Sequence, residues 1–498
     1  MTEISVAPVV SALREAGLVV EVSGALPEFV SGISDESRTV GAGALFVAVR
    51  GSERDGHEFL AQAAASGAVA AIVESNGRSE LPAIRVRDGR RADAIAAAAG
   101  YGNPAKLLRL AGVTGTNGKT TTVGILRHLM DGAHGGGRSA SMGTLGVLVG
   151  SEGKAVEGGA GLTTPGPIEL QRVLRLLADA GVVTVAMEVS SHSLDQRRVE
   201  GVSFSAAVFT NFTRDHLDYH GTMEEYRAAK AKLLDHLTPD GVAVINRDDP
   251  AWETLQTPSR AVSFAVARSD ADVQAVDVRY GPRGSEWRMR IGTEVRDVKL
   301  PLIGSFNVAN ALGAAAAAWA LGVSAGRITE RFETIPQVPG RLEMLSDRPT
   351  VLRDYAHTPD ALERTLEAVR PFTRGKLIAV FGCGGDRDRG KRPVMGRIAA
   401  DRADVVIVTS DNPRTEDPER ILDDIIGGMP RGPHERIEDR REAIAHALAM
   451  AGEGDLIVLA GKGHETYQIK GTTKYPFDER EIVGELLSER RGPPPKSV

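Results

Sequence analysis

Residues 112–122 have the composition of a phosphate-binding loop. They read Gly-Val-Thr-Gly-Thr-Asn-Gly-Lys-Thr-Thr-Thr, between a predicted buried strand over 107–113 and a predicted helix over 120–130. A glycine-rich turn before a helix directs backbone N–H groups and the positive helix end toward phosphate oxygens. Lys119 would reach the terminal phosphates of a nucleotide, and the Thr120 hydroxyl would bind Mg²⁺. Val113 stands where the strict pattern has glycine, so the loop is a variant.

Three further side chains are candidates for phosphate and metal chemistry. Glu188 directly follows the apolar run 182–187, which is where a Mg²⁺-binding carboxylate is expected in a nucleotide-binding domain. His216 lies in Asp-His-Leu-Asp-Tyr-His-Gly, a segment that fits either a capped turn or a metal site. Lys230, by its spacing alone, is predicted to be a solvated lysine on a helix.

Three predicted strands near the C-terminus are each followed by a glycine-rich or polar segment. The segments are Gly-Cys-Gly-Gly-Asp-Arg-Asp after 377–381, Ser-Asp-Asn-Pro-Arg after 405–409, and Gly-Lys-Gly-His-Glu after 456–460. Because the carboxyl ends of parallel strands share one edge of a sheet, these segments predict a polar crevice there. Cys383 is interpreted as a small turn residue rather than a nucleophile.

Strands alternate with helices along most of the chain, which predicts an α/β fold with mostly parallel sheets. Glu188, His216 and the phosphate loop are all expected at carboxyl ends of strands, and the Pro-Gly-Arg at 339–341 is predicted to be a hinge. The predicted parts are a small N-terminal α/β domain over 1–107, a central P-loop-type ATPase domain over 108–340, a C-terminal Rossmann-like domain over 341–490 and a disordered tail over 491–498.

The composition is that of an ordinary soluble globular protein. The 498 residues are 42% hydrophobic and 25% charged, and the formal net charge of −6 gives no electrostatic case for binding nucleic acid or anionic membrane. Cys383 is the single cysteine, so no disulfide framework is expected. With neither a signal peptide nor a long apolar segment, we expect a cytoplasmic protein that acts on small molecules. The oligomeric state is not readable.

Seven segments together resemble the Mur ligase family, over nearly the whole chain. They are Thr-Gly-Thr-Asn-Gly-Lys-Thr at 114–120, Met-Glu-Val-Ser-Ser-His at 187–192, 210–221 around Asp-His-Leu-Asp-Tyr-His-Gly, Asp-Tyr-Ala-His-Thr-Pro at 354–359, 384–388, 411–414 and 461–465. The first three are shared with the superfamily that includes folylpolyglutamate synthases, and the last three resemble the branch that forms the muramoyl tripeptide. The resemblance implies an amide ligase that uses ATP to activate a carboxylate as an acyl phosphate, which an amine then attacks.

The resemblance also implies roles for individual residues. The implied ATP contacts are Gly115, Thr116, Asn117, Gly118, Lys119, Thr120, Thr121, Asn307, Asn310, Arg341 and Asp354. The implied catalytic residues are Lys119, Glu188, His216 and Lys230. Of the implied metal ligands, Thr120 and Glu188 hold one Mg²⁺, His216 helps to hold a second, and Lys230 takes part as a carbamate formed with CO₂. The implied contacts to the UDP-N-acetylmuramoyl dipeptide are Ser37, Thr163, Thr164, Ser190, Gln196 and Arg198. The implied diaminopimelate contacts are Arg387, Asp411, Asn412, Arg414, Gly461 and Glu465.

The Asp-Asn-Pro-Arg segment at 411–414 resembles the diaminopimelate-adding enzymes. Diaminopimelate has a second amino acid head. Arg414 can bind the carboxylate of that head through two hydrogen bonds, and Glu465 can form an ion pair with its ammonium. Lysine lacks that carboxylate and would leave Arg414 unpaired, at a cost of about a few kcal/mol. The leading prediction is addition of meso-diaminopimelate to the D-glutamate γ-carboxylate of UDP-N-acetylmuramoyl-L-alanyl-D-glutamate, in peptidoglycan precursor synthesis.

Other readings stay open from the sequence. The same ligase could use LL-diaminopimelate, lysine or ornithine, and a folylpolyglutamate synthase-like ligase or a nucleotide-switched binding protein are more distant alternatives. The family usually has Asp-Ser-Arg where this chain has Glu36-Ser37-Arg38, and the difference bears on uridine binding.

Overall fold

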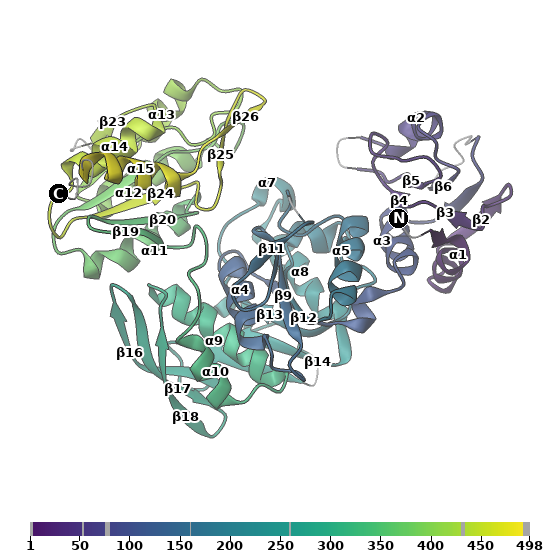
Figure 1. Cartoon of the computed structure of the whole chain (residues 1–498), viewed down its shortest axis with the longest axis horizontal. Coiled ribbons are helices and arrows are strands. Elements are labelled where there is room, and N and C mark those ends of the chain that lie inside the picture. Colours follow the sequence, from purple (N-terminus) through teal and green to yellow (C-terminus); the bar gives the residue numbers. More distant parts are fainter. Residues whose placement is uncertain are drawn as a thin grey trace, which may run out of the picture. The chain divides into compact units, whose positions relative to one another are not determined.

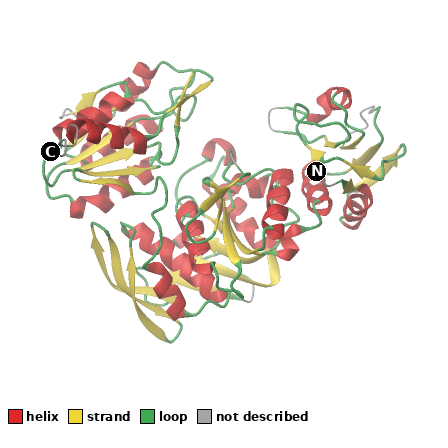
Figure 2. Cartoon of the chain, in the orientation of Figure 1, coloured by secondary structure: helices red, strands yellow, loops and turns green. Residues whose placement is uncertain are grey.

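The computed structural model describes residues 3–51, 54–74, 80–159, 161–257, 260–429 and 434–491 (Figure 1). The chain divides into two compact units. The first comprises Met1–Ala275, Arg290–Arg296 and Ala309–Arg331, and the second comprises Val276–Met289, Asp297–Val308 and Phe332–Val498. Helices and strands alternate in both, which confirms the α/β fold (Figure 2). The domain limits at 107 and 340 stay predictions.

The first unit begins with a five-stranded sheet in the order β2-β7-β6-β5-β4, parallel except for β2. Successive strand residues point to opposite faces, so Leu45 and Val47 pack toward α1 and α3 while Phe46 packs toward α2. The bounds here are β1 Ile4–Ser5, α1 Val6–Glu15, β2 Val19–Ser23, β3 Phe29–Val30, β4 Ile33–Ser34, β5 Leu45–Val47, α2 Leu60–Ala65, β6 Ala70–Val73, β7 Ala83–Val86 and α3 Gly89–Gly100.

The same unit contains most of an eleven-stranded sheet, whose strand order begins β11-β10-β9-β12-β8-β13-β14-β15-β16 and ends with β17 and β18. Its strands from β9 to β16 are parallel, and β10 and β11 form an antiparallel edge. The bounds are β8 Arg109–Thr114, α4 Lys119–Met130, β9 Arg138–Gly143, β10 Gly146–Val149, β11 Lys154–Val156, α5 Pro167–Asp179, β12 Val182–Glu188, α6 Ser191–Asp195, β13 Phe204–Phe209, α7 Leu217–His220, α8 Met223–Ala231, β14 Leu237–Asn246 and β15 Ala261–Ala265.

The central strands β8, β12 and β13 are buried along most of their length, as expected for parallel strands that are covered on both faces. The strand and helix predicted around the phosphate loop are confirmed as β8 and α4. His216 was wrongly expected at a strand end, since β13 ends at Phe209 and His216 instead precedes α7.

Five elements have residues in both units. They are β16 Val273–Gly281, β17 Gly284–Ile291, β18 Glu294–Leu300, α9 Ser305–Ala320 and α10 Ala325–Phe332.

The second unit contains a six-stranded sheet in the order β19-β20-β24-β21-β22-β23, parallel except for β19. Helices α11, α12 and α13 pack on one face, and α14 and α15 pack on the other. The bounds are β19 Glu343–Asp347, β20 Thr350–Asp354, α11 Pro359–Val369, β21 Leu377–Phe381, α12 Lys391–Arg402, β22 Val405–Val408, α13 Pro418–Ile426, β23 His434–Arg436, α14 Arg440–Met450, β24 Leu456–Ala460, β25 Tyr467–Lys470, β26 Thr473–Pro476 and α15 Glu479–Arg491.

The strand register of this sheet brings the predicted polar segments together. The neighbouring strands β20, β24, β21 and β22 all end at the same level of the sheet. Their last residues, Asp354, Ala460, Phe381 and Val408, are successive partners in the register. The segments that follow them therefore share one edge, as predicted. The predicted tail, residues 491–498, lies outside the described residues apart from the last residue of α15.

Candidate functional site

The phosphate loop of the first unit requires glycine at two positions. Gly115 and Gly118 have φ angles of 150° and 84°, in the region that residues with side chains avoid. A Cβ atom on Gly115 would overlap the Thr210 hydroxyl, and one on Gly118 would overlap the Asn310 amide oxygen. The Asn117 N–H donates to the side-chain oxygen of Asn211 at 2.8 Å, which fixes the loop against the segment after β13.

Lys119 folds back over this loop. Its ammonium donates to the carbonyl oxygens of Gly115 and Thr116, each at 2.9 Å. Thr120 is buried in the first turn of α4, beside Lys119. The loop thus combines a cation, a hydroxyl and a helix N-terminus, the groups that bind nucleotide phosphates.

Glu188 lies beside the loop because its strand is the neighbour of β8. It is the last residue of β12, is paired in register with Val113 and is 2% exposed. One carboxylate oxygen accepts the Thr144 N–H at 2.9 Å, and the other accepts the Thr144 hydroxyl at 3.3 Å. Within the described ranges, no group of three or more His, Cys, Asp or Glu side chains could hold a metal ion. A cation here would therefore need further oxygen ligands from phosphate and water.

Lys230 is not the solvated lysine that its spacing predicted. It is 1% exposed on α8, and its Nζ donates to the Gly115 carbonyl at 2.7 Å. The ammonium also lies 4.4 Å from the ring centre of Tyr226, one turn earlier. Burial, with a smaller contribution from Lys119, holds the pKa of Lys230 well below its ordinary value. The prediction was wrong because Lys230 is on the face of α8 that covers the loop.

His216 and a histidine that the sequence analysis missed lie together. The His216 ring is 4.7 Å from the ring of His192, which also packs 4.3 Å from Tyr219 and 5.3 Å from His220. Nε2 of His216 lies 3.5 Å from the Asp215 carboxylate, and burial lowers the pKa of His216 to about 4. The Ser-Ser-His sequence directly after β12 was the available signal for His192.

Four of the residues predicted to bind the muramoyl dipeptide are joined by hydrogen bonds. The Thr164 hydroxyl donates to the Glu188 carbonyl at 2.9 Å and accepts the Ser190 N–H at 3.1 Å. The Arg198 guanidinium donates to the Thr164 carbonyl at 3.1 Å and to the Gln196 side chain at 2.6 Å.

The other two predicted dipeptide residues make different contacts. The Thr163 hydroxyl lies 3.4 Å from the Thr144 hydroxyl, next to Glu188. Ser37 lies beyond β4 in the small sheet, where its hydroxyl donates to Gln62 at 3.3 Å.

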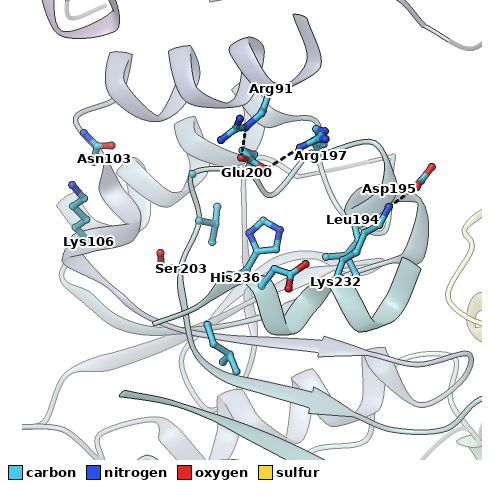
Figure 3. Close-up of a pocket in the computed structure, with 14 residues that line it drawn as sticks. Arg91, Asn103, Lys106, Leu194, Asp195, Arg197, Glu200, Ser203, Lys232 and His236 are labelled. Carbon is cyan, nitrogen blue, oxygen red and sulfur yellow. Dashed lines mark hydrogen bonds and ion pairs between the residues drawn. The ribbon is translucent and has the colours of Figure 1, made fainter. Parts of the chain in front are cut away.

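A cavity of about 660 Å³ in the first unit lies at the amino ends of β13 and β14 (Figure 3). Figure 3 shows Arg91 directed toward Glu200, at 2.7 Å, and Lys232 toward Asp195, at 2.8 Å. No predicted site residue lines it, and the phosphate loop follows the carboxyl end of β8 instead. These lining charges largely neutralise one another.

In the second unit, the predicted amino acid residues form one polar group. Nδ2 of Asn412 donates to the Glu465 carboxylate at 2.9 Å, and Gly461, at φ 115°, lies against the Asp411 carboxylate. Arg414 has a φ of 52° and donates to the Gly385 carbonyl at 2.8 Å. Arg387 donates to the carbonyl of its neighbour Asp386 at 3.0 Å, in an exposed turn. The structure also places a residue here that the sequence analysis missed, the fully buried Lys462.

Three residues of the second unit are predicted to contact the nucleotide: Asn307 in α9, Arg341 just before β19 and Asp354 at the end of β20. Both oxygens of the buried Asp354 accept hydrogen bonds, from the Leu342 N–H at 2.7 Å and the Thr365 hydroxyl at 3.1 Å. Burial raises the pKa of Asp354. The Arg341 guanidinium lies 4.9 Å from the ring centre of Tyr355. Asn307, near the start of α9, donates to the Ile303 carbonyl at 2.8 Å.

Comparison with known proteins identifies the family. Residues 113–318 match the Mur ligase middle domain, residues 340–463 match the Mur ligase glutamate ligase domain, and residues 29–101 match the Mur ligase family catalytic domain. The chain belongs to the Mur ligase family.

Its relatives within the Mur ligases resemble it over nearly their whole length. The UDP-N-acetylmuramoyl-L-alanyl-D-glutamate–2,6-diaminopimelate ligase of Gloeobacter violaceus is 47% identical, over 94% of this chain and 96% of the relative. The ligase of the same name from Geobacillus kaustophilus is 43% identical, over 94% and 96%. A solved structure of a protein with this name has a TM-score of 0.67 and 33% identity, over 95% of this chain and 98% of that one.

The Mur ligase domains cover most of the predicted site. The middle-domain match contains Lys119, Glu188, His216 and Lys230, and the glutamate ligase match contains Arg414 and its neighbours but ends before Glu465. No helix in the described part of this Mur ligase is both long and apolar enough to span a membrane.

Proposed function

We propose that this Mur ligase joins meso-diaminopimelate to the D-glutamate γ-carboxylate of UDP-N-acetylmuramoyl-L-alanyl-D-glutamate with the use of ATP, in the cytoplasm, as a step of peptidoglycan precursor synthesis. The observation that carries the proposal is the identity of 41–47% to relatives named as diaminopimelate ligases, over 92–94% of this chain. The arrangement of polar side chains supports the same chemistry.

The reaction transfers the γ-phosphoryl group of ATP to the glutamate carboxylate and releases ADP. The diaminopimelate amine then attacks the acyl phosphate, the new C–N bond forms, and phosphate leaves with the loss of a proton from nitrogen. Both steps bring anions together, so cations near the transferred group lower the barrier. The loop N–H groups and the Lys119 ammonium, which already lies against the loop carbonyls, supply part of that charge.

The donor set also suits magnesium. Thr120 and Glu188 offer oxygen atoms, which Mg²⁺ prefers, and His216 lies beside a carboxylate. We propose that Thr120 and Glu188 hold one Mg²⁺ and that His216 helps to hold a second, which would supply further positive charge at the phosphates.

Lys230 is suited to carbamate formation. Its burial favours the neutral amine, the form that attacks CO₂. The amine nitrogen forms a bond to carbon and loses a proton, so that the product is a carbamate anion. This change would convert a buried amine into an anion with two oxygen atoms beside Gly115, where it can position the metal or the phosphate.

We propose binding roles for the remaining residues from their match to the motifs of the Mur ligase family. Thr164, Ser190, Gln196 and Arg198 form the polar group next to Glu188 and would bind the dipeptide, together with Thr163. Ser37 would contact the uridine part. Asn117, Thr116, Thr121, Asn307, Asn310, Arg341 and Asp354 would contact the nucleotide.

The amino acid specificity is assigned to the polar group of the second unit. Arg414 would bind the distal carboxylate of diaminopimelate, and Glu465 would bind the distal ammonium. Arg387, Asp411, Asn412 and Gly461 would complete the pocket.

The direct test is phosphate release with ATP, Mg²⁺ and UDP-N-acetylmuramoyl-L-alanyl-D-glutamate, with one amino acid added at a time. We expect release with meso-diaminopimelate and much less with LL-diaminopimelate, lysine or ornithine. Release with lysine or ornithine alone would retain the ligase and overturn the assignment of Arg414. Phosphate release at the same rate with and without an added amino acid would instead indicate a nucleotide-switched binding protein.

A further inference from the structure

Lys462 is a lysine whose whole side chain is buried in the second unit. Its ammonium lies 3.2 Å from the Glu465 carboxylate, 3.2 Å from Oδ1 of Asn412 and 3.6 Å from the Asp411 carboxylate. The rings of Tyr467 and Phe477 are each centred 5.9 Å from the same nitrogen. A buried ammonium is stable only when such partners replace its lost hydration.

These contacts fix the orientation of the Asn412 side chain. Oδ1 accepts two hydrogen bonds, from Lys462 and from the Ile469 N–H at 2.9 Å. Because two donors face Oδ1, the NH₂ end must point the other way, and there it donates to Glu465 at 2.9 Å. Lys462 and Asn412 therefore contact the same oxygen of Glu465 and hold that carboxylate in place.

The hairpin of β25 and β26 supports the same group from the backbone. The Gln468 side chain donates to the Asp411 carbonyl at 2.8 Å, and the Arg414 N–H donates to the Ile469 carbonyl at 3.1 Å. Arg414 and Lys470 also form a parallel bridge. The hairpin thus fixes the backbone of the residues that surround Lys462.

Lys462 offsets the two carboxylates that it contacts, those of Asp411 and Glu465. These three side chains carry a formal net charge of −1, and without Lys462 that charge would be −2. In a partly desolvated pocket, the added negative charge favours a lone ammonium such as that of lysine over a zwitterionic head.

We propose that Lys462 is a positioning residue that sets specificity for the distal amino acid head of diaminopimelate. It orients Asn412 and Glu465, and its positive charge offsets the carboxylates of Asp411 and Glu465, so that a head with both an ammonium and a carboxylate is preferred over an ammonium alone. This inference rests on the proposed ligase function.

The test compares Lys462→Met with wild type and with Lys474→Met, in which an exposed lysine of β26 undergoes the same change. The KM and kcat are measured for meso-diaminopimelate and for lysine, together with the KM for ATP. For Lys462→Met we expect the KM for diaminopimelate to rise about tenfold or more and the preference for diaminopimelate over lysine to fall by a similar factor, with the KM for ATP unchanged. Lys474→Met should resemble wild type.

A second variant separates positioning from charge and also serves if Lys462→Met does not fold. Lys462→Met combined with Asp411→Asn removes one charge of each sign, so it should regain part of the preference over lysine while its KM for diaminopimelate stays raised. A wild-type preference and KM in Lys462→Met would overturn the inference, and so would an equal rise in the KM for ATP. If the wild-type protein releases phosphate at the same rate with and without each amino acid, the ligase function itself is rejected.

Discussion

Lys230 donates a hydrogen bond from Nζ to the carbonyl oxygen of Gly115, 2.7 Å away and 115 positions earlier in the chain. The Lys119 ammonium donates to the same oxygen at 2.9 Å. Two lysines thus converge on one carbonyl of the phosphate loop, and their repulsion adds to burial in lowering the pKa of Lys230. Helix α8 is thereby tied to the loop that it covers.

The first prediction concerns this lysine. Lys230→Ala should lower ligase activity by about a hundredfold or more, because the anionic group proposed to form there is lost. Bicarbonate or a small carboxylate such as formate should restore part of the activity. Lys232→Ala is the control, since that lysine is exposed and pairs with Asp195. Unchanged turnover by Lys230→Ala would contradict the carbamate assignment.

The second prediction tests the shape of the phosphate loop. Gly118→Ala should raise the KM for ATP strongly and destabilise the fold by about 1–2 kcal/mol or more, because the new methyl group needs a positive φ and overlaps Asn310. Gly136→Ala has a similar φ of 77° with nothing within 4 Å, so it isolates the backbone strain. Thermal unfolding and ATP kinetics on both variants measure the difference, and an equal loss of ATP affinity in both would argue against the steric explanation.

The third prediction is a pH dependence of stability. Asp93 on α3 is fully buried and one of its oxygens has no hydrogen bond, so burial, with a contribution from Asp35, raises its pKa well above the ordinary value. Below a pH of about 4 the Asp93 carboxyl is protonated in both the folded and the unfolded state, so its ionisation does not change the free energy of unfolding. As the pH rises toward the folded pKa, the unfolded chain loses this proton first, so stability should fall by about 1.4 kcal/mol per pH unit.

Asp93→Asn should remove that slope and stabilise the protein at neutral pH, as measured by thermal unfolding between pH 4 and pH 8. Asp401→Asn, at an exposed position of α12, should leave the slope in place. A slope that persists in Asp93→Asn would assign it to another group.

The fourth prediction concerns a buried ion pair behind the amino acid group. Arg440 and Glu479 are both fully buried at 2.8 Å, and Arg440 also donates to the carbonyls of Ser410 and Ala460, which precede Asp411 and Gly461. Arg440→Met should destabilise the fold by about 3–5 kcal/mol because it leaves Glu479 buried without its partner.

Arg440→Met combined with Glu479→Met should recover most of that loss. Arg441→Met breaks an exposed pair with Glu485 and should cost less than about 1 kcal/mol. Chemical unfolding midpoints compare the three variants, and a double variant as unstable as Arg440→Met would show that the carbonyl contacts dominate.

The sequence by itself determined the local features of this protein. The strand, loop and helix around Lys119 follow from apolar periodicity and glycine spacing, and so do Glu188 at a strand end and the polar segments after β21, β22 and β24. These features depend on neighbouring residues, which a linear pattern records. The motifs also determined the family, because their residue types and order are specific to it.

Only the tertiary structure decided which charged residues are buried. The spacing of Lys230 predicts a solvated lysine, and no pattern singles out Lys462. Both are buried by packing, Lys230 against Gly115 of the phosphate loop and Lys462 beside Tyr467 and Asn412. Asp93 is inaccessible for the same kind of reason. Burial depends on long-range packing, and burial is what removes water, shifts a pKa and makes one charged contact matter more than another.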